Sequence, residues 1–289
     1  MSVLVTGFNG KVGIEVARKM NERNLSFTCA VRNVQKAQRM YGGEFSFVTL
    51  DFSDPATFGA ALEGIDQVFL MYPPGDQIKF HQFLKVIKEK GVQHIVYLSV
   101  KDVQYLPFIH HFKNEKLLKR LGIPYTFIRA GYFMQNLHDF LGREIREKNR
   151  IFVPAGKGKT SFVDTRDLAE VAIHAFQHPE EFRNTSHVIT GEKAFDFYEV
   201  AEIMTAVLGE RIVYANPSFK EFKSYMVNKG EKEEFVNVVI GIHFPTKLGL
   251  AKGVTEDFEK ISKSKPIALE KYVKDYKQKW LPDEEGHEQ

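Results

Sequence analysis

The stretch that decides the fold is residues 3–13, which read Val-Leu-Val-Thr-Gly-Phe-Asn-Gly-Lys-Val-Gly. Its three leading aliphatic residues form the short apolar run that is typical of a strand buried on both faces. Gly7, Gly10 and Gly13 follow, and apolar residues then recur at helical spacing as far as Met20. The pattern predicts a strand, a glycine turn and a helix, which together begin a βαβ unit.

The glycine spacing predicts a pyrophosphate site at the start of this helix. Gly7 permits a tight turn, Gly10 lets the backbone approach a phosphate, and Gly13 lets the helix press against the strand. Free N–H groups and the helix dipole favour an anion there. The order G-x-x-G-x-x-G differs from the usual G-x-G-x-x-G, so an ordinary βαβ turn is the alternative. The position directly after a strand favours the dinucleotide site.

Arg32 indicates which dinucleotide is expected. The second apolar run, residues 27–31, ends at Arg32, where sites selective for NAD carry an acidic residue. A guanidinium there suits the 2′-phosphate of NADP, because it forks onto phosphate oxygens. Lys36, one helical turn further on, adds a second positive charge. We therefore expect NADP, with NADPH preferred to NADH; a solvated arginine at a strand end is the alternative.

The composition is that of a globular protein. The chain has 289 residues, of which 43% are hydrophobic, enough for a large core or two lobes. It has no apolar stretch of membrane-spanning length and no cleavable signal, so we expect a cytoplasmic protein without a membrane partner. The net charge of +3 is dispersed, which argues against a nucleic-acid partner. Cys29, the only cysteine, is expected to be a small buried hydrophobe. The locally basic stretch 143–159, interrupted by Glu144 and Glu147, is expected to be a solvated helix face.

Strand and helix patterns alternate through the first half of the chain. Asp51 follows the third strand and is expected either to approach an adenine or to serve as a turn acid. The loop at residues 72–75 follows the fourth strand and should border the cofactor, because ligands bind beyond the carboxyl ends of parallel strands. Further strands are predicted at 45–50, 67–71, 93–98 and 124–129, with helices at 77–90 and 112–121. The alternation predicts an α/β fold with a Rossmann-type, doubly wound parallel sheet of order 3-2-1-4-5-6.

The second half predicts a smaller, mostly helical C-terminal lobe. Short strands are expected at 151–154 and 187–190, and helices at 166–177 and 200–208. Asp196 and Glu199 form a capping-box pattern before the second of these helices. Residues 217–242 are expected to be helical, and two more short helices are expected between 255 and 280. We assign residues 1–154, with returning segments at about 160–192, to an NADP-binding domain. Residues 193–289 form the predicted substrate lobe.

Several stretches resemble the NmrA-like family of atypical short-chain dehydrogenases. They are the glycine turn, Ala-Val-Arg-Asn at 30–33, His111-Phe112-Lys113, residues 125–136 and residues 162–169. The resemblance covers nearly the whole chain and is greatest to bacterial NAD(P)H-dependent quinone and azo reductases. Other branches are benzylic-ether and isoflavone reductases, and regulators that bind the dinucleotide without turning it over.

The resemblance implies an extended Rossmann fold and a role for each matching residue. The residues from Gly7 to Val12 would hold the phosphates, Asp51 and Phe52 the adenine, and Tyr72 and Pro73 the nicotinamide side. Lys113 would lie beside the nicotinamide ribose as the catalytic residue, although an ordinary surface lysine is the alternative. The complete set expected to bind the cofactor is Gly7, Asn9, Gly10, Lys11, Val12, Gly13, Arg32, Asp51, Phe52, Tyr72, Pro73, Lys113, Tyr132, Phe133 and Asn136.

The chain departs from the Tyr-x-x-x-Lys pattern of the wider superfamily. Ile109 stands at the tyrosine position before Lys113, and Ser99 stands where the usual serine would be. Interconversion of alcohols and ketones is therefore not expected. His110 precedes Lys113 on the same helix face, and we expect it to be an exposed or packing histidine. A quinone that receives a hydride becomes a stabilised phenolate and takes its proton from water, so Lys113 suffices to stabilise the oxyanion.

These residues predict an NADPH-dependent reductase of a small, planar quinone-like or azo acceptor, acting as a monomer or homodimer without a metal. The acceptor would lie among aromatic and apolar side chains; candidates are Tyr72, Phe133, Met134, Phe162 and either Phe222 or Tyr225. A redox sensor that binds NADP(H) without turnover is the alternative. An ether reductase with Lys113 as proton donor is a third hypothesis.

Overall fold

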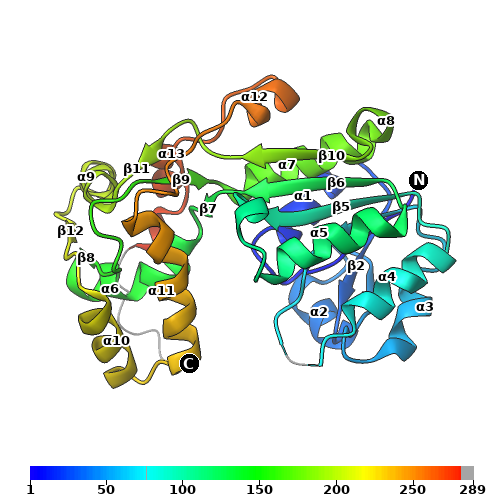
Figure 1. The fold of residues 1–289 in the computed structure, drawn as a ribbon, viewed down its shortest axis with the longest axis horizontal. Coiled ribbons are helices and arrows are strands. Elements are labelled where there is room, and N and C mark those ends of the chain that lie inside the picture. Colours follow the sequence, from blue (N-terminus) through cyan, green and yellow to red (C-terminus); the bar gives the residue numbers. More distant parts are fainter. Residues whose placement is uncertain (76, 281–289) are drawn as a thin grey trace. The chain divides into compact units, whose positions relative to one another are not determined.

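The computed structural model describes residues 1–75 and 77–280 (Figure 1). Its central feature is a seven-stranded sheet of order β10-β6-β5-β4-β1-β2-β3, with parallel pairing throughout. The strands are β1 (Val3–Val5), β2 (Phe27–Val31), β3 (Phe47–Thr49), β4 (Gln67–Leu70), β5 (His94–Val100), β6 (Tyr125–Ala130) and β10 (Thr185–Ile189). The predicted fold class and order are confirmed. A seventh strand, β10, extends the sheet beyond β6.

Helices cover both faces of this sheet, as a doubly wound fold requires. Helices α3, α4 and α5 contribute Phe58, Leu84 and Leu118 to the core of one face, whereas α1 and α2 contribute Ala17 and Ala37 to the other. The helices of this part are α1 (Gly13–Glu22), α2 (Val34–Tyr41), α3 (Phe58–Ala61), α4 (Phe80–Glu89), α5 (His110–Leu121), α7 (Thr165–Gln177), α8 (Pro179–Phe182) and α12 (Asp257–Ser262). Short 3-10 turns lie at Pro55–Thr57 (η1), Val103–Tyr105 (η2) and Lys277–Lys279 (η3).

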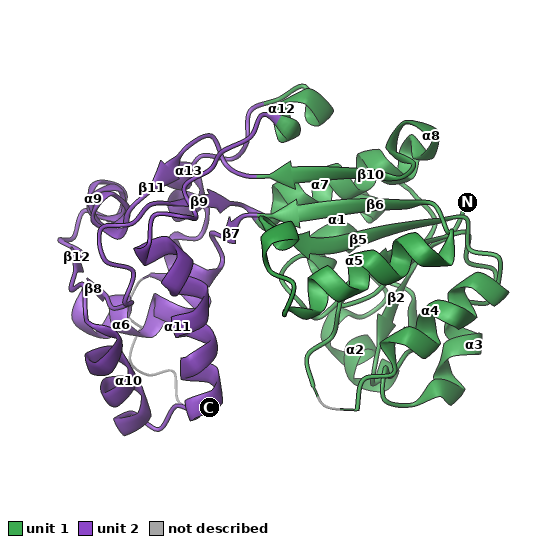
Figure 2. Ribbon diagram, viewed as in Figure 1, with its two compact units in different colours: residues 1–130, 165–189, 257–264 green, residues 131–164, 190–256, 265–289 purple. Residues whose placement is uncertain are grey.

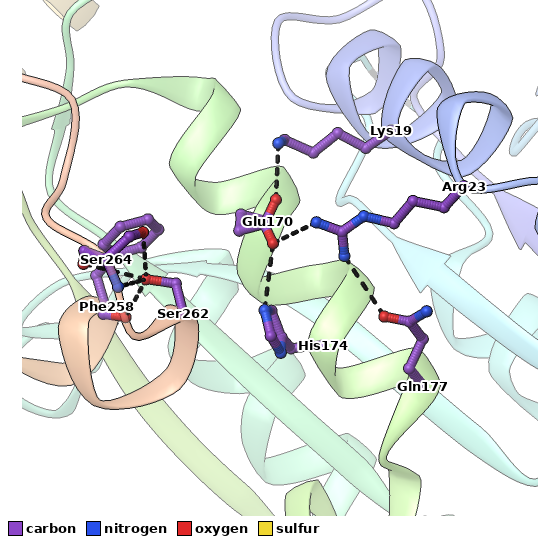
Figure 3. A network of polar contacts seen from close by, with 8 residues as sticks. All are labelled: Lys19, Arg23, Glu170, His174, Gln177, Phe258, Ser262 and Ser264. Carbon is purple, nitrogen blue, oxygen red and sulfur yellow. Dashed lines mark hydrogen bonds and ion pairs between the residues drawn. The ribbon is translucent and has the colours of Figure 1, made fainter.

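Glu170 on α7 ties this helix to α1 (Figure 3). Its carboxylate accepts a hydrogen bond from Lys19 at 2.7 Å and a second from the Arg23 guanidinium. His174 lies one turn further along α7, with its Nε2 3.2 Å from the same carboxylate. Burial alone would raise the pKa of Glu170, but the bonds from Lys19 and Arg23 lower it overall. The pair of helices is thus joined by a half-buried charge cluster as well as by apolar packing.

The chain divides into two compact units, which Figure 2 colours separately. Unit 1 contains residues 1–130, 165–189 and 257–264, and therefore the whole seven-stranded sheet. Unit 2 contains residues 131–164, 190–256 and the chain from 265 onward. The chain leaves unit 1 directly after Ala130, so residues 131–154, which we expected in the NADP-binding domain, lie in unit 2.

Unit 2 is mostly helical, with two small sheets. Its strands are β7 (Tyr132–Phe133), β9 (Thr160–Val163) and β11 (Ala194–Phe195) in one sheet, and β8 (Arg150–Ile151) with β12 (Val213–Tyr214) in the other. Its helices are α6 (Asn136–Lys148), α9 (Phe197–Leu208), α10 (Phe219–Asn228), α11 (Glu233–Lys247) and α13 (Leu269–Asp275). The region 217–242, which we expected to be helical, consists of two helices, α10 and the greater part of α11. Gly230, with a φ of 90°, separates α10 from α11 because the left-handed conformation ends a helix.

Glu144 contradicts the expectation of a solvated face in the basic stretch. Only 5% of this residue is exposed. Its Oε1 accepts hydrogen bonds from Tyr225 at 2.7 Å and Lys229 at 2.6 Å, and its Oε2 accepts one from Arg150 at 2.8 Å. Burial would raise the pKa of Glu144, but these bonds lower it to about 2. Two of the three partners, Tyr225 and Lys229, lie 81 and 85 residues away in the sequence, so local charge spacing did not indicate that Glu144 is buried.

Two smaller observations bear on the composition. Cys29 is a free, fully buried thiol, and burial raises its pKa to about 12, which confirms it as a small core residue. Among the residues that the structure describes, no helix combines the length and the apolar character needed to span a bilayer.

Candidate functional site

A pocket of about 550 Å³ lies in unit 1 beyond the carboxyl ends of β1 to β4. Its volume falls within the range of small-molecule sites. Each of the four strands leads into a segment that lines it. The lining residues are Gly7 to Gly10 after β1, Ala30 to Arg32 at the end of β2, Leu50 to Ser53 after β3, and Met71 to Gly75 with Ile78 after β4.

The glycine turn forms one wall of the pocket. Gly7 has a φ of 65°, and a Cβ added there would lie 2.7 Å from the sulfur of Met71. A Cβ at Gly13 would lie only 2.2 Å from the carbonyl oxygen of Gly7, so the start of α1 packs directly on the turn. The Gly10 amide donates to the same carbonyl at 2.8 Å. Gly7 and Gly13 therefore have the conformational and packing roles that we predicted for them.

In the part of the chain that the structure describes, the start of α1 lacks a side-chain cap, so its backbone amides can bind an anionic ligand. Within the described chain, its N-cap residue Val12 forms no side-chain capping bond. Asn9 is exposed and lines the pocket, whereas Val12 is buried and Lys11 half-buried, and neither of these two is among the lining residues. The uncapped amide groups at this helix end favour an anion.

Arg32 and Asp51 stand on the wall formed by β2 and β3. Arg32 is exposed at the end of β2. Asp51 accepts hydrogen bonds at its Oδ1 from the hydroxyl of Ser53 at 2.7 Å and from its amide at 2.9 Å. These two bonds lower the pKa of Asp51, and the charge of Arg32 lowers it further. Asp51 is thus a turn acid that also lines the pocket, and one acidic and one basic side chain share this wall.

A chain of aromatic rings runs along the same edge of the sheet. Phe52 lies near-parallel to Phe80, with ring centroids 6.2 Å apart, and Phe80 meets Tyr72 edge-on at 5.1 Å. His110, the first residue of α5, stacks on Tyr72 with centroids 4.9 Å apart and 17° between the ring planes. Tyr72 and Pro73 line the pocket, as does Phe52. The sequence did not indicate the stack, because it joins two connections that are far apart in the chain.

Lys113 lies one turn after His110 on α5. Its side chain is exposed, and within the described residues it forms no ion pair. It is not among the residues that line the pocket. Its neighbour Asn114 faces inward and donates to the hydroxyl of Tyr97 at 3.1 Å. The role of Lys113 beside a nicotinamide ribose stays a prediction.

Ser99 is buried, and it is not among the residues that line the pocket. Its hydroxyl donates to Glu115 at 2.7 Å, and only 1% of the residue is exposed. Arg129 donates to both oxygens of the same carboxylate, at 3.0 and 2.6 Å. This bidentate ion pair holds α5 against β6. Ser99 therefore has a structural partner here in place of the tyrosine that the superfamily pattern would supply.

Three predicted cofactor residues, Tyr132, Phe133 and Asn136, belong to unit 2. Tyr132 is buried, which raises its pKa, and its hydroxyl lies 3.2 Å from Nε2 of His243. Because the other nitrogen of His243 contacts the Val239 carbonyl at 2.8 Å, it carries the proton, and Tyr132 donates to Nε2. Its phenol is thus engaged within the core of unit 2. That these three residues reach a cofactor stays a prediction.

The predicted acceptor walls of unit 2 are largely core residues. Phe162 and Phe222 are buried, and Tyr225 is bound to Glu144 as described above. Met134 and Phe162 line a cavity of about 140 Å³ together with residues of the segment after Ile189 and of α13. This volume is too small for an aromatic acceptor of several rings.

The chain is similar to a known protein family and to several known reductases. The model of the NmrA-like family matches residues 1–277. An NAD(P)H azoreductase from Xenophilus azovorans is 30% identical over 268 residues, which cover 90% of this chain and 92% of that relative. A triphenylmethane reductase from Citrobacter sp., solved in complex with NADP(H), superimposes with a TM-score of 0.84 at 25% identity and covers 95% of this chain and 99% of its own. An NADPH-dependent quinone oxidoreductase from Escherichia coli, solved in complex with NADPH, superimposes with a TM-score of 0.84 at 21% identity. The alignment covers 94% of this chain and 98% of that one, and it shows that the two proteins share a fold.

Proposed function

Because this chain belongs to the NmrA-like family, we propose that it is an NADPH-dependent reductase that transfers a hydride to a quinone-like or azo acceptor. The observation that carries the proposal is the pocket of unit 1, where a glycine turn and an exposed arginine line one cavity. The reductases similar to this chain, described above, support the choice of reaction class.

The residues of the pocket fit NADPH. A side chain at Gly7 or Gly13 would fill the turn, and the uncapped start of α1 suits a pyrophosphate. Arg32 would hold the 2′-phosphate, and the stacked ring of Tyr72 would border the nicotinamide. Asp51 would face the adenine with the carboxylate oxygen that Ser53 does not use. No acidic residue follows β2 at the position of Arg32, which favours NADPH over NADH.

The chain's own residues favour an acceptor that needs no strong proton donor. When bound, NADPH supplies the hydride. Lys113 carries an exposed ammonium group that stabilises negative charge developing on the acceptor oxygen or nitrogen. Ser99 is tied to Glu115 and cannot donate to a substrate. A phenolate or a hydrazine anion would then take its proton from water, because the Lys113 side chain is exposed to solvent.

Turnover tests this proposal directly. The full chain is mixed with NADPH and, in separate reactions, with menadione, 1,4-benzoquinone or the azo dye methyl red, and the loss of NADPH absorbance is recorded. We expect steady oxidation with at least one acceptor and a slower rate with NADH. If NADPH binds but no acceptor is reduced, the reductase proposal is wrong.

One observation favours a second candidate, a redox sensor that binds NADP(H) without turnover. Lys113 is not among the residues that line the pocket, and Ser99 is occupied by Glu115, so unit 1 presents few groups for chemistry. The turnover assay, together with a calorimetric titration with NADPH, separates the two functions, because a sensor would bind NADPH and leave every acceptor unchanged.

A further inference from the structure

The connection between β5 and α5 carries two strongly exposed aromatic rings. Tyr105 is 75% exposed and Phe108 is 73% exposed, the two highest values among the exposed large hydrophobic side chains of the described residues. The first belongs to the 3-10 turn η2, and the second lies just before α5. Two such rings within four residues expose aromatic surface to solvent on one short connection, where a planar ligand could cover both of them.

The backbone of this connection is anchored by a buried side chain and by hydrogen bonds. Val103 is buried, with 1% of its surface exposed. The amide of Tyr105 donates to the carbonyl of Asp102 at 3.0 Å, and the amide of Ile109 donates to that of Leu106 at 3.2 Å. Asp102 also pairs with Lys101. Successive turns therefore order the backbone that carries the two rings, which lowers the entropic cost of binding a ligand there.

The rings continue the edge of the sheet that holds the pocket. Strand β5 lies parallel to and beside β4, whose following loop supplies Tyr72 and Pro73 to the pocket wall. The connection after β5 ends at His110, which stacks on Tyr72. The aromatic chain that starts at Phe52 thus leads to the connection that carries Tyr105 and Phe108.

We propose that Tyr105 and Phe108 form the acceptor-binding surface and select planar acceptors with several fused rings. This inference rests on the proposed reductase function and adds the residues that determine acceptor size. A single-ring acceptor offers little aromatic area for stacking. An acceptor of three fused rings offers more, so it gains more from contact with two exposed rings. The surface therefore contributes to the KM of large acceptors and not to the hydride-transfer rate.

The double variant Tyr105→Ser/Phe108→Ser tests this assignment. The full chain with NADPH is assayed with 9,10-phenanthrenequinone, which has three fused rings, and with 1,4-benzoquinone, which has one. We expect KM for phenanthrenequinone to rise about tenfold, with kcat unchanged and both constants for benzoquinone unchanged. Met40→Ser is the matched control, because Met40 is 63% exposed on α2 and lies outside the pocket lining. Equal changes with both quinones, or no change with either, would overturn the proposal.

A binding measurement separates this inference from the reductase proposal. The affinity of the NADP⁺-saturated chain for anthraquinone-2-sulfonate, a three-ring probe that cannot be reduced by the oxidised coenzyme, is measured by calorimetry in wild type and double variant. If the variant binds the probe more weakly and the wild type reduces no acceptor, the acceptor-binding surface is supported and the reductase proposal is wrong. Unchanged binding rejects the surface. Light scattering completes the test: a wild-type dimer that the double variant converts to a monomer shows that a second copy covers the rings, which also overturns the proposal.

Discussion

His110 lies parallel on the ring of Tyr72, with the two centroids 4.9 Å apart and 17° between the planes. The contact joins the first residue of α5 to the loop after β4, which lines the pocket. One face of the Tyr72 ring is covered by His110, and Phe80 meets it edge-on. The ring is therefore held in one orientation at the rim of the pocket.

Removing the imidazole should loosen this ring. We expect His110→Ala to weaken NADPH binding about fivefold, because an aromatic pair contributes roughly 1 kcal/mol beyond burial. His110→Phe should restore the affinity, since it restores the stack. The measurement is calorimetry, with His81→Ala on α4 as control because His81 is also exposed. Equal losses in His110→Ala and His110→Phe would show that stacking is not the cause.

Reversing the charge of Arg32 should change coenzyme preference. Arg32→Glu should weaken NADPH binding roughly thirtyfold, since a hydrogen bond to a charged group contributes about 2 kcal/mol. NADH, which lacks the 2′-phosphate, should bind about as before. Arg39→Glu provides the control, because this exposed arginine lies on α2, donates to the Gln35 carbonyl and is not among the residues that line the pocket. Parallel losses for both coenzymes would remove Arg32 from the phosphate site.

Lys113 should affect turnover more than coenzyme binding. Lys113→Ala should lower kcat about tenfold, a modest loss for an oxyanion donor because the exposed ammonium is screened by water. The dissociation constant of NADPH should change little. Lys116→Ala on the same helix is the control, since its ammonium lies over the Phe112 ring. An unaltered kcat in Lys113→Ala would exclude the lysine from the reaction.

Glu170 should matter for the stability of unit 1. Glu170→Gln leaves Lys19 and Arg23 without their shared carboxylate in a half-buried cluster. We expect the free energy of unfolding to fall by about 2 kcal/mol. Glu180→Gln should have almost no effect, because that carboxylate is 85% exposed in its pair with Arg183. Urea unfolding near neutral pH measures both, and comparable losses in the two variants would contradict the role of burial.

His94 should make the protein sensitive to acid. Burial lowers its pKa from 6.5 to about 4, and the charge of Arg183 adds to this effect. Between these values the unfolded chain binds a proton that the folded chain does not, so stability falls as the pH is lowered from 6.5 towards 4. The full loss is about 3 kcal/mol. Urea unfolding at pH 7 and pH 4.5 should show a smaller difference in His94→Gln than in wild type; an equal difference would exclude His94 as the cause.

The sequence predicts those features that depend on neighbours in the chain. The glycine turn at Gly7 to Gly13 and the six alternating strands are confirmed, because spacing and apolar runs decide them locally. The capping pair Asp196 and Glu199 is confirmed at the start of α9 for the same reason. At the site, Arg32, Asp51 and Tyr72 line one pocket because the carboxyl ends of parallel strands meet at one edge.

The features that were missed depend on partners far apart in the sequence. Glu144 is bound by Tyr225 and Lys229, which no local pattern connects to it. The stack of His110 on Tyr72 likewise joins separate connections, and Tyr132 bonds to a histidine of α11. The chain also returns to unit 1 at residues 257–264, where Asp257 accepts a hydrogen bond from the Val188 amide of β10 at 2.8 Å. Hydrophobic periodicity gives no signal for such a return.

Calorimetric titration of the full chain with NADPH tests the central claim most directly. The claim is that the glycine turn and Arg32 of unit 1 receive the phosphate groups of this coenzyme. The account predicts saturable binding of one NADPH per chain, tighter than that of NADH under the same conditions. A titration that gives no heat of binding at any temperature tested, together with an unchanged melting temperature at saturating NADPH, would contradict it.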